Sequence, residues 1–264
     1  MTEETVELAR AWHEGPAGPA PLVIAHGLFG SGRNWATLAR RFAESRPVAT
    51  VDLRNHGDSP WHDSHSYPDM AADLAAVIDA NGGRADVVGH SMGGKAAMAA
   101  ALQAPDKVAA LVVADIAPIP YAHSHAGFIQ AMRSVDLGAV SRRSDADPML
   151  ASAIPEAPLR AFILQNLVVE NGGARWRLNL EALAVAMPDL LDWPASLADK
   201  RYEGPALFIR GGASDYAPAG ADEAIRAAFP RAEIAVVEGA GHWLHAERPA
   251  EFFETVSGWL SRTL

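Results

Sequence analysis

The stretch VVGHSMGGKAA, residues 87–97, places one serine between glycines at the end of an apolar run. The spacing from Gly89 through Ser91 to Gly93 fits G-x-S-x-G, the nucleophile elbow of serine hydrolases. A sharp strand-to-helix turn holds such a serine in strained backbone geometry, and a side chain two residues away on either side would clash. The pattern therefore predicts Ser91 as a nucleophile. Because so short a pattern also occurs by chance, the rest of the chain must supply its context.

Composition limits the class of protein. The 264 residues are 49% hydrophobic and 20% charged, as expected for a soluble globular chain with a substantial core. A net charge of −10 disfavours nucleic acid and anionic membrane surfaces as partners, because both select a basic face. The absence of cysteine excludes disulfides, thiol catalysis and zinc–thiolate sites.

The first residues, MTEETVELARAWHEG, are acidic and contain no apolar signal-peptide core. No apolar run approaches the length of about 18 residues that a membrane helix needs. We therefore expect a cytoplasmic protein that does not bind membranes. The sequence does not predict its oligomeric state.

Short apolar runs alternate with longer helical patterns, which predicts βαβ units and a mostly parallel sheet. The predicted strands are residues 21–25, 47–51, 85–89, 108–114, 205–210 and 233–237, with an edge strand near 6–12. The predicted helices are residues 34–46, 69–80, the segment after Ser91, and 249–260. Apolar positions at helical spacing would face the sheet.

Residues from about 118 to 197 interrupt this alternation with repeated prolines and helical patterns. They contain no convincing strand, and a structureless loop of that length is rare in a compact domain. We expect a helical cap at 118–195, inserted into a core formed by 1–117 and 196–264.

A serine that attacks an ester needs backbone N–H groups directed at the oxyanion that forms. The motif HGLFG, residues 26–30, directly follows the first core strand. One donor should be the residue after the nucleophile, Met92, and the other should come from this loop. Leu28 is the predicted donor, and Phe29 is the fallback. Phe29 and Trp243 adjoin the motifs and are the predicted substrate-pocket residues.

The motif GAGHWLH, residues 239–245, follows the last strand. Its His242 is placed where the general base belongs in the chain order Ser…Asp…His. His245, three residues later, is predicted to be structural.

The acid that orients the histidine has two candidates in the sequence. Asp115 ends the run VAALVVAD, and Asp215 follows PALFIRGGAS. Both come after predicted strands and lie between the serine and the histidine in the chain. Either could instead be a turn-forming or helix-capping aspartate.

Five motifs, HGLFGSGRNW, DLRNHGDS, GHSMGGK, DIAP and AGHWLHAERP, resemble those of the α/β-hydrolase superfamily. The similarity is strongest to small bacterial esterases related to the animal abhydrolase-domain-11 proteins. It implies an α/β-hydrolase fold with a mostly parallel sheet, flanking helices and an inserted cap. It also implies a serine esterase for short acyl esters or thioesters, with no metal and no organic cofactor. In that family the acid is similar to Asp115, whereas the wider superfamily favours the position of Asp215; we favour Asp115.

Other interpretations of the motifs remain. The same triad performs C–C bond hydrolysis, perhydrolysis or acyl transfer in other proteins, and the fold also occurs as a non-catalytic binding module. The loop DLRNHGDSP, residues 52–60, is predicted to be structural through Asp52, Arg54 and Gly57. The histidine pairs at 62/65 and 123/125 are interpreted as solvated rather than as metal ligands, because a metal needs three or four converging ligands.

Overall fold

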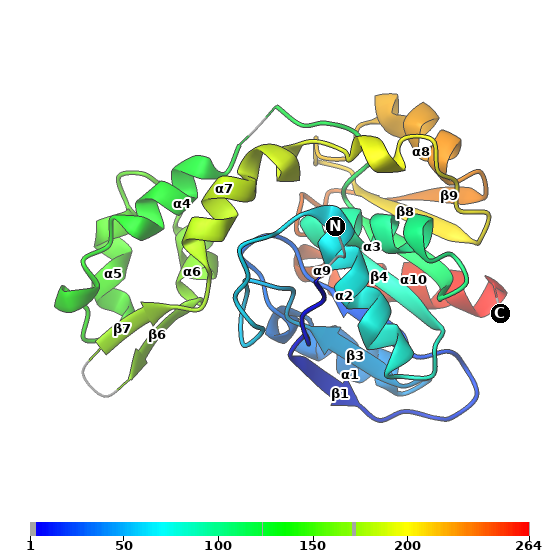
Figure 1. The fold of residues 1–264 in the computed structure, drawn as a ribbon, viewed down its shortest axis with the longest axis horizontal. Coiled ribbons are helices and arrows are strands. Elements are labelled where there is room, and N and C mark those ends of the chain that lie inside the picture. Colours follow the sequence, from blue (N-terminus) through cyan, green and yellow to red (C-terminus); the bar gives the residue numbers. More distant parts are fainter. Residues whose placement is uncertain (1–3, 123, 171–172, 264) are drawn as a thin grey trace.

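The computed structural model describes residues 4–122, 124–170 and 173–263. Figure 1 shows a larger body built on a twisted sheet and a smaller body formed by the labelled elements α4 to α7, β6 and β7. Both chain ends lie on the larger body, so the smaller one is an insertion in the chain.

Within the described residues, seven strands form one sheet in the order β1-β3-β2-β4-β5-β8-β9. Only β1 is antiparallel, and it pairs with β3 at the edge. The strands are β1 Arg10–His13, β2 Leu22–Ala25, β3 Val48–Val51, β4 Ala85–His90, β5 Val108–Ala114, β8 Ala206–Gly211 and β9 Ala232–Val237. The predicted mostly parallel α/β fold is confirmed.

Helices cover both faces of this sheet (Figure 1). They are η1 Gly32–Trp35, α1 Ala36–Ala43, α2 Tyr67–Asp79, α3 Met92–Gln103, α8 Asp222–Ala228, α9 Leu244–Glu247 and α10 Pro249–Thr263. Successive strand residues point to opposite faces. Val23 therefore joins the cluster containing the residues of α2 and α3, whereas Ile24 joins the cluster of α1 and α10.

The inserted segment contains α4 Ala126–Arg133, α5 Arg143–Leu150, α6 Ala157–Leu164 and α7 Leu180–Leu191. It also contains an antiparallel pair, β6 Leu167–Glu170 and β7 Gly173–Trp176. The expectation that this segment lacks strands was therefore wrong. The pair is held against α4 because the indole N–H of Trp176 donates to the carbonyl of Met132 at 3.0 Å. The boundaries 118 and 195 stay a prediction.

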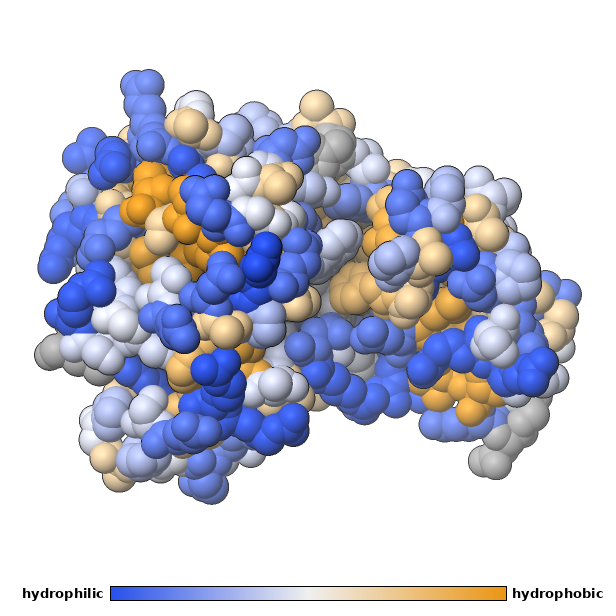
Figure 2. Space-filling view, turned by 180° about the vertical axis from the view of Figure 1, so that it is seen from behind, coloured by the Kyte–Doolittle hydropathy of each residue, from blue (hydrophilic) through white to orange (hydrophobic). Residues whose placement is uncertain are grey.

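Figure 2 shows the face opposite to that of Figure 1, with blue hydrophilic side chains spread over both bodies and separate orange hydrophobic patches among them. None of the helices within the described ranges is long and apolar enough to cross a membrane.

Candidate active site

Ser91 lies in the turn between β4 and α3, with φ 52° and ψ −121°. This conformation is strained for a residue with a side chain. The neighbouring glycines make the turn possible. A Cβ on Gly89 would lie 2.2 Å from the carbonyl oxygen of Gly93, and one on Gly93 would lie 2.4 Å from the carbonyl oxygen of His26. The helix start and the end of β2 therefore touch through Gly93.

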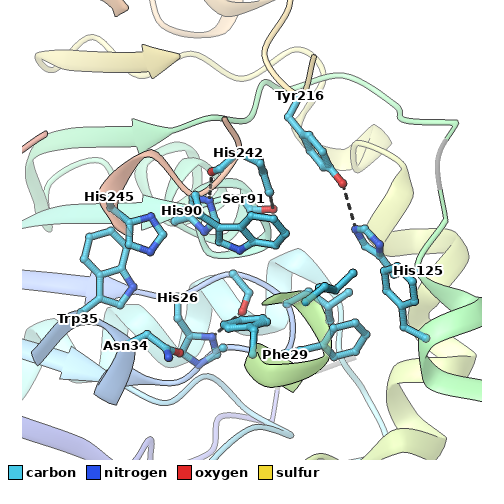
Figure 3. Close-up of a pocket in the computed structure, with 17 residues that line it drawn as sticks. His26, Phe29, Asn34, Trp35, His90, Ser91, His125, Tyr216, His242 and His245 are labelled. Atoms are coloured by element: carbon cyan, nitrogen blue, oxygen red, sulfur yellow. Dashed lines mark hydrogen bonds between the residues drawn. The ribbon is translucent and has the colours of Figure 1, made fainter. Parts of the chain in front are cut away.

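His242 joins Ser91 to Asp115. Its Nε2 lies 3.0 Å from Ser91 Oγ, and its Nδ1 lies 2.8 Å from Asp115 Oδ2. Figure 3 shows the His242 and Ser91 side chains next to each other, joined by a dashed line. Because a carboxylate accepts hydrogen bonds, Nδ1–H donates to Asp115 and leaves Nε2 free to accept the serine proton.

Asp115 follows β5 and is 1% exposed. Its Oδ1 accepts the amide of Gly211 at 2.9 Å, and its Oδ2 also accepts the hydroxyl of Ser214. Its backbone has φ 52°, and its own amide donates to Ile209 at 2.8 Å across the sheet. These contacts fix the carboxylate between the ends of β5 and β8.

Asp215, the other candidate acid, is exposed in the loop after β8. Among the described residues, no hydrogen bond joins its carboxylate to His242. The structure thus brings Asp115, and not Asp215, to the histidine.

The loop after β2 forms a tight turn. The amide of Gly30 donates to the carbonyl of Gly27 at 2.9 Å, and Phe29 has φ 61°. Positive φ at the third residue alone defines a type II turn, which normally has glycine there. The amides of Leu28 and Met92 have no hydrogen-bond acceptor among the described residues. The amide of Phe29, in contrast, donates to His56 Nε2 at 3.3 Å.

Two buried histidines hold this turn in place. His56 donates from Nδ1 to the carbonyl of Arg54 at 3.0 Å, so its Nε2 is the acceptor for Phe29. His26 donates from Nδ1 to the carbonyl of Gly27 at 2.8 Å, and its Nε2 accepts the amide of Leu53 at 3.0 Å. Burial lowers the pKa of His26 to about 4 and that of His56 to about 3. Both rings are therefore neutral, as their hydrogen bonds require.

This fold has known counterparts. Residues 20–249 match a family model described as the alpha/beta hydrolase fold. The chain belongs to the α/β-hydrolase family.

Related α/β-hydrolases are similar over nearly the whole chain. The mouse sn-1-specific diacylglycerol lipase ABHD11 is 42% identical, and the match covers 94% of this chain and 83% of the mouse protein. The esterase YbfF of Escherichia coli is 36% identical, with 92% of this chain and 93% of the bacterial protein covered. A solved structure of a marine microorganism esterase has a TM-score of 0.91 and 36% identity, and covers 96% of this chain and 99% of its own.

Several contacts of this α/β-hydrolase site were not predicted from the motifs. The ring of Tyr216 stacks on His242, with centroids 3.6 Å apart and planes at 21°. His90 Nε2–H donates to the carbonyl of His242 at 2.8 Å, although it lies inside the elbow motif itself. Asn166, between α6 and β6, donates from Nδ2 to the carbonyl of Phe29 at 2.8 Å. These contacts position His242 and the turn from three different elements.

The interpretation of the histidine pairs as solvated was wrong for His65. His65 is 2% exposed, and its Nε2 lies 3.5 Å from the sulfur of Met92. His125 lines the same cavity as Ser91, where Tyr216 Oη lies 3.4 Å from its Nε2 (Figure 3). His123 lies outside the described residues.

A cavity of about 200 Å³ contains the hydrolase site. Phe29 and Trp243, the predicted pocket residues, both line it together with Ser91 and His242. His245 also lines it, and its ring is stacked on Trp35 with the planes at 5°. A second cavity of about 40 Å³ borders Ser91 and Met92 on another side.

Proposed function

We propose that this α/β-hydrolase is a serine esterase that hydrolyses short-chain carboxylic esters or thioesters through an acyl-enzyme. The observation that carries the proposal is the continuous set of hydrogen bonds from Ser91 through His242 to Asp115. The esterases and the lipase among the relatives support the reaction class.

In the first half of the reaction, His242 Nε2 accepts the hydroxyl proton as Ser91 Oγ attacks the ester carbonyl carbon. Asp115 stabilises the resulting imidazolium and keeps the ring oriented. The carbonyl oxygen becomes an oxyanion that the amides of Leu28 and Met92 receive. The tetrahedral intermediate collapses, and the leaving oxygen of an ester, or the leaving sulfur of a thioester, takes the proton from Nε2.

In the second half, a water molecule takes the place of the leaving alcohol or thiol. His242 removes one of its protons as the water oxygen attacks the acyl carbon. The same two amides receive the second oxyanion. Collapse returns the proton to Ser91 and releases the carboxylic acid.

We assign the amide of Leu28, rather than that of Phe29, as the second donor to the oxyanion. Supporting it, the Phe29 amide is already bonded to His56, whereas those of Leu28 and Met92 have no acceptor within the described part of the chain. We also propose that residues 118–195 act as a cap that supplies part of the substrate wall, through Phe128, Leu159 and Phe162.

Hydrolysis of p-nitrophenyl acetate and butyrate tests the proposal. Ser91→Ala should lower kcat by a factor of about 10⁴ or more, and Asp115→Asn by about 10² to 10⁴. Asp215→Asn is the matched control, since the exposed Asp215 does not contact His242. Loss of activity in Asp215→Asn but not in Asp115→Asn would reverse the acid assignment.

A fluorophosphonate probe separates this proposal from the other activities of the fold. Covalent labelling of Ser91 together with ester turnover supports an esterase. Labelling without turnover of any oxygen ester or thioester would favour C–C hydrolysis, perhydrolysis or acyl transfer. Absence of both would favour a non-catalytic binding module.

A further inference from the structure

Ser91 lies where two cavities of unequal size meet. The larger one has a volume of about 200 Å³ and the smaller one about 40 Å³. Both are lined by Ser91, Leu28, His125 and Tyr216, so they adjoin at the nucleophile. We call them the large lobe and the small lobe.

The two lobes differ in which catalytic groups they contact. His242 lines the large lobe but does not line the small one, whereas Met92 lines only the small lobe. The leaving oxygen must be within hydrogen-bond reach of His242 Nε2 to receive its proton. The leaving group of a productive ester therefore extends into the large lobe.

The other substituents of the carbonyl carbon follow from this placement. The carbonyl oxygen points to the amides of Leu28 and Met92, and the leaving group points to His242. The acyl chain takes the remaining direction, which is the small lobe. Resting on the proposed esterase function, we infer that the substrates are esters of a short acid with a bulky apolar or aromatic alcohol.

The small lobe is bounded by the end of α7, which the core holds firmly. Tyr67 Oη donates to the carbonyl of Leu190 at 2.7 Å. The amide of Tyr121 donates to the carbonyl of Leu191 at 2.8 Å. Lys95 Nζ donates to the carbonyl of Asp192 at 2.8 Å. Because these bonds fix the wall, the lobe has little room to expand around a longer acyl chain.

The large lobe has a different lining. Phe128 and Phe162 line it from the inserted segment, and the ring centroid of Phe162 lies 6.1 Å from that of Trp243. Trp243 is 38% exposed, so this lobe opens to solvent beside it. An aromatic or extended alcohol group can pack on these rings and project outwards.

Two isomeric esters test the assignment directly. Benzyl acetate places the phenyl group in the alcohol, and methyl phenylacetate places it in the acid. Their leaving alcohols have similar basicity, and dividing each enzymatic rate by the hydroxide-catalysed rate removes any remaining difference in reactivity. We expect kcat/KM for benzyl acetate to exceed that for methyl phenylacetate by about tenfold or more.

Equal rates, or a preference for methyl phenylacetate, would overturn the lobe assignment. So would turnover of p-nitrophenyl acetate with no turnover of either isomer. If p-nitrophenyl acetate is not hydrolysed either, the esterase proposal itself fails, which is a separate result.

Two variants extend the test. Met187 lines the small lobe from α7, and Met187→Ala should raise the ratio of p-nitrophenyl hexanoate to acetate turnover by about tenfold. Phe162→Ala enlarges the large lobe and should change alcohol preference while leaving that acyl ratio within about twofold of wild type. A shift of the acyl ratio in Phe162→Ala but not in Met187→Ala would reverse the lobes. Circular dichroism checks that both variants fold, and the isomer pair needs no variant.

Discussion

The ring of Tyr216 covers one face of the His242 imidazole, with 3.6 Å between the centroids. The backbone of Tyr216 is also anchored, because its carbonyl accepts a hydrogen bond from the hydroxyl of Tyr121 at 2.6 Å. The His242 ring is therefore fixed at its edge by Asp115 and on its face by the ring of Tyr216, which the loop after β8 supplies.

Tyr216→Ala should lower kcat by about threefold to tenfold, the value of an aromatic contact of about 1 kcal/mol. Tyr216→Phe keeps the stacked ring and should retain most of the activity. Steady-state kinetics on p-nitrophenyl acetate measures both. Equal losses in the two variants would assign the effect to the hydroxyl near His125 instead of the stack.

We predict that Asn166, in the inserted segment, supports the tight turn at residues 27–30 that carries the proposed oxyanion donor Leu28. The strained Phe29 conformation costs roughly 1 to 3 kcal/mol, and the Asn166 amide holds its carbonyl. Asn166→Ala and Asn166→Asp both remove the donor. Each should lower kcat by about tenfold with little change in KM, because oxyanion contacts act in the transition state.

The neighbouring Gln165 provides the control for Asn166. It is exposed, and its Oε1 accepts from Asn34 at 2.9 Å across the same junction. Gln165→Ala should leave kcat within about twofold of wild type. A rise in KM alone in the Asn166 variants would indicate a role in substrate binding and contradict the positioning role.

Buried histidines predict acid sensitivity of the fold. Burial lowers the pKa of His245 to about 3, and its Nδ1 has no partner among the described residues. The unfolded chain then binds more protons than the folded one below a pH of about 6.5, so stability falls as the pH decreases through that value. His26, His56, His65 and His90 have pKa values lowered mainly by burial as well.

His245→Phe keeps a ring stacked on Trp35 and removes the titrating group. Between pH 7.5 and 5.5 the wild type should lose about 1.4 kcal/mol more free energy of unfolding than this variant. Urea unfolding at the two pH values measures the difference. Parallel losses in the two proteins would show that His245 does not contribute.

Lys95 predicts a second pH dependence with a separate window. Burial lowers its pKa from 10.5 to about 7, so the folded chain binds fewer protons than the unfolded one between these values. Burying the charged lysine lowers the free energy of unfolding by its full amount below pH 7, and this loss disappears as the pH rises towards 10.5. From pH 7.5 to 9.5 the free energy of unfolding should rise by on the order of 2 kcal/mol more in wild type than in Lys95→Met. Urea unfolding that gives the same slope in both proteins would contradict this.

The buried strands could be predicted closely because they are continuous apolar runs. Strand β5 occupies the predicted residues 108–114. The edge strand instead forms at Arg10–His13, since an alternating, half-exposed pattern does not fix its own limits. The hairpin of β6 and β7 was missed among the prolines, although the Asn-Gly pair at 171–172 between short apolar runs is a sequence signal for it.

The candidate site was predictable where a motif fixes it and ambiguous where tertiary geometry decides. Ser91 and His242 follow from local spacing and chain order. Asp115 and Asp215 follow neighbouring parallel strands, β5 and β8, so sequence order alone treats them alike. The amide of Gly211 and the hydroxyl of Ser214 select Asp115 by holding its carboxylate toward the histidine. Contacts of this kind join distant segments and leave no local pattern.

The close approach at Gly93 also bears on the proposed oxyanion hole. Leu28 and Met92 belong to segments far apart in sequence, and these segments approach so closely at Gly93 that a Cβ there would lie 2.4 Å from the carbonyl oxygen of His26. A methyl group at this position would act as a spacer between the two amides. Such a variant would keep Ser91 and His242 but would no longer hold the two amides at the spacing that an oxyanion needs. The nucleophile and the oxyanion donors are therefore separable properties of this site.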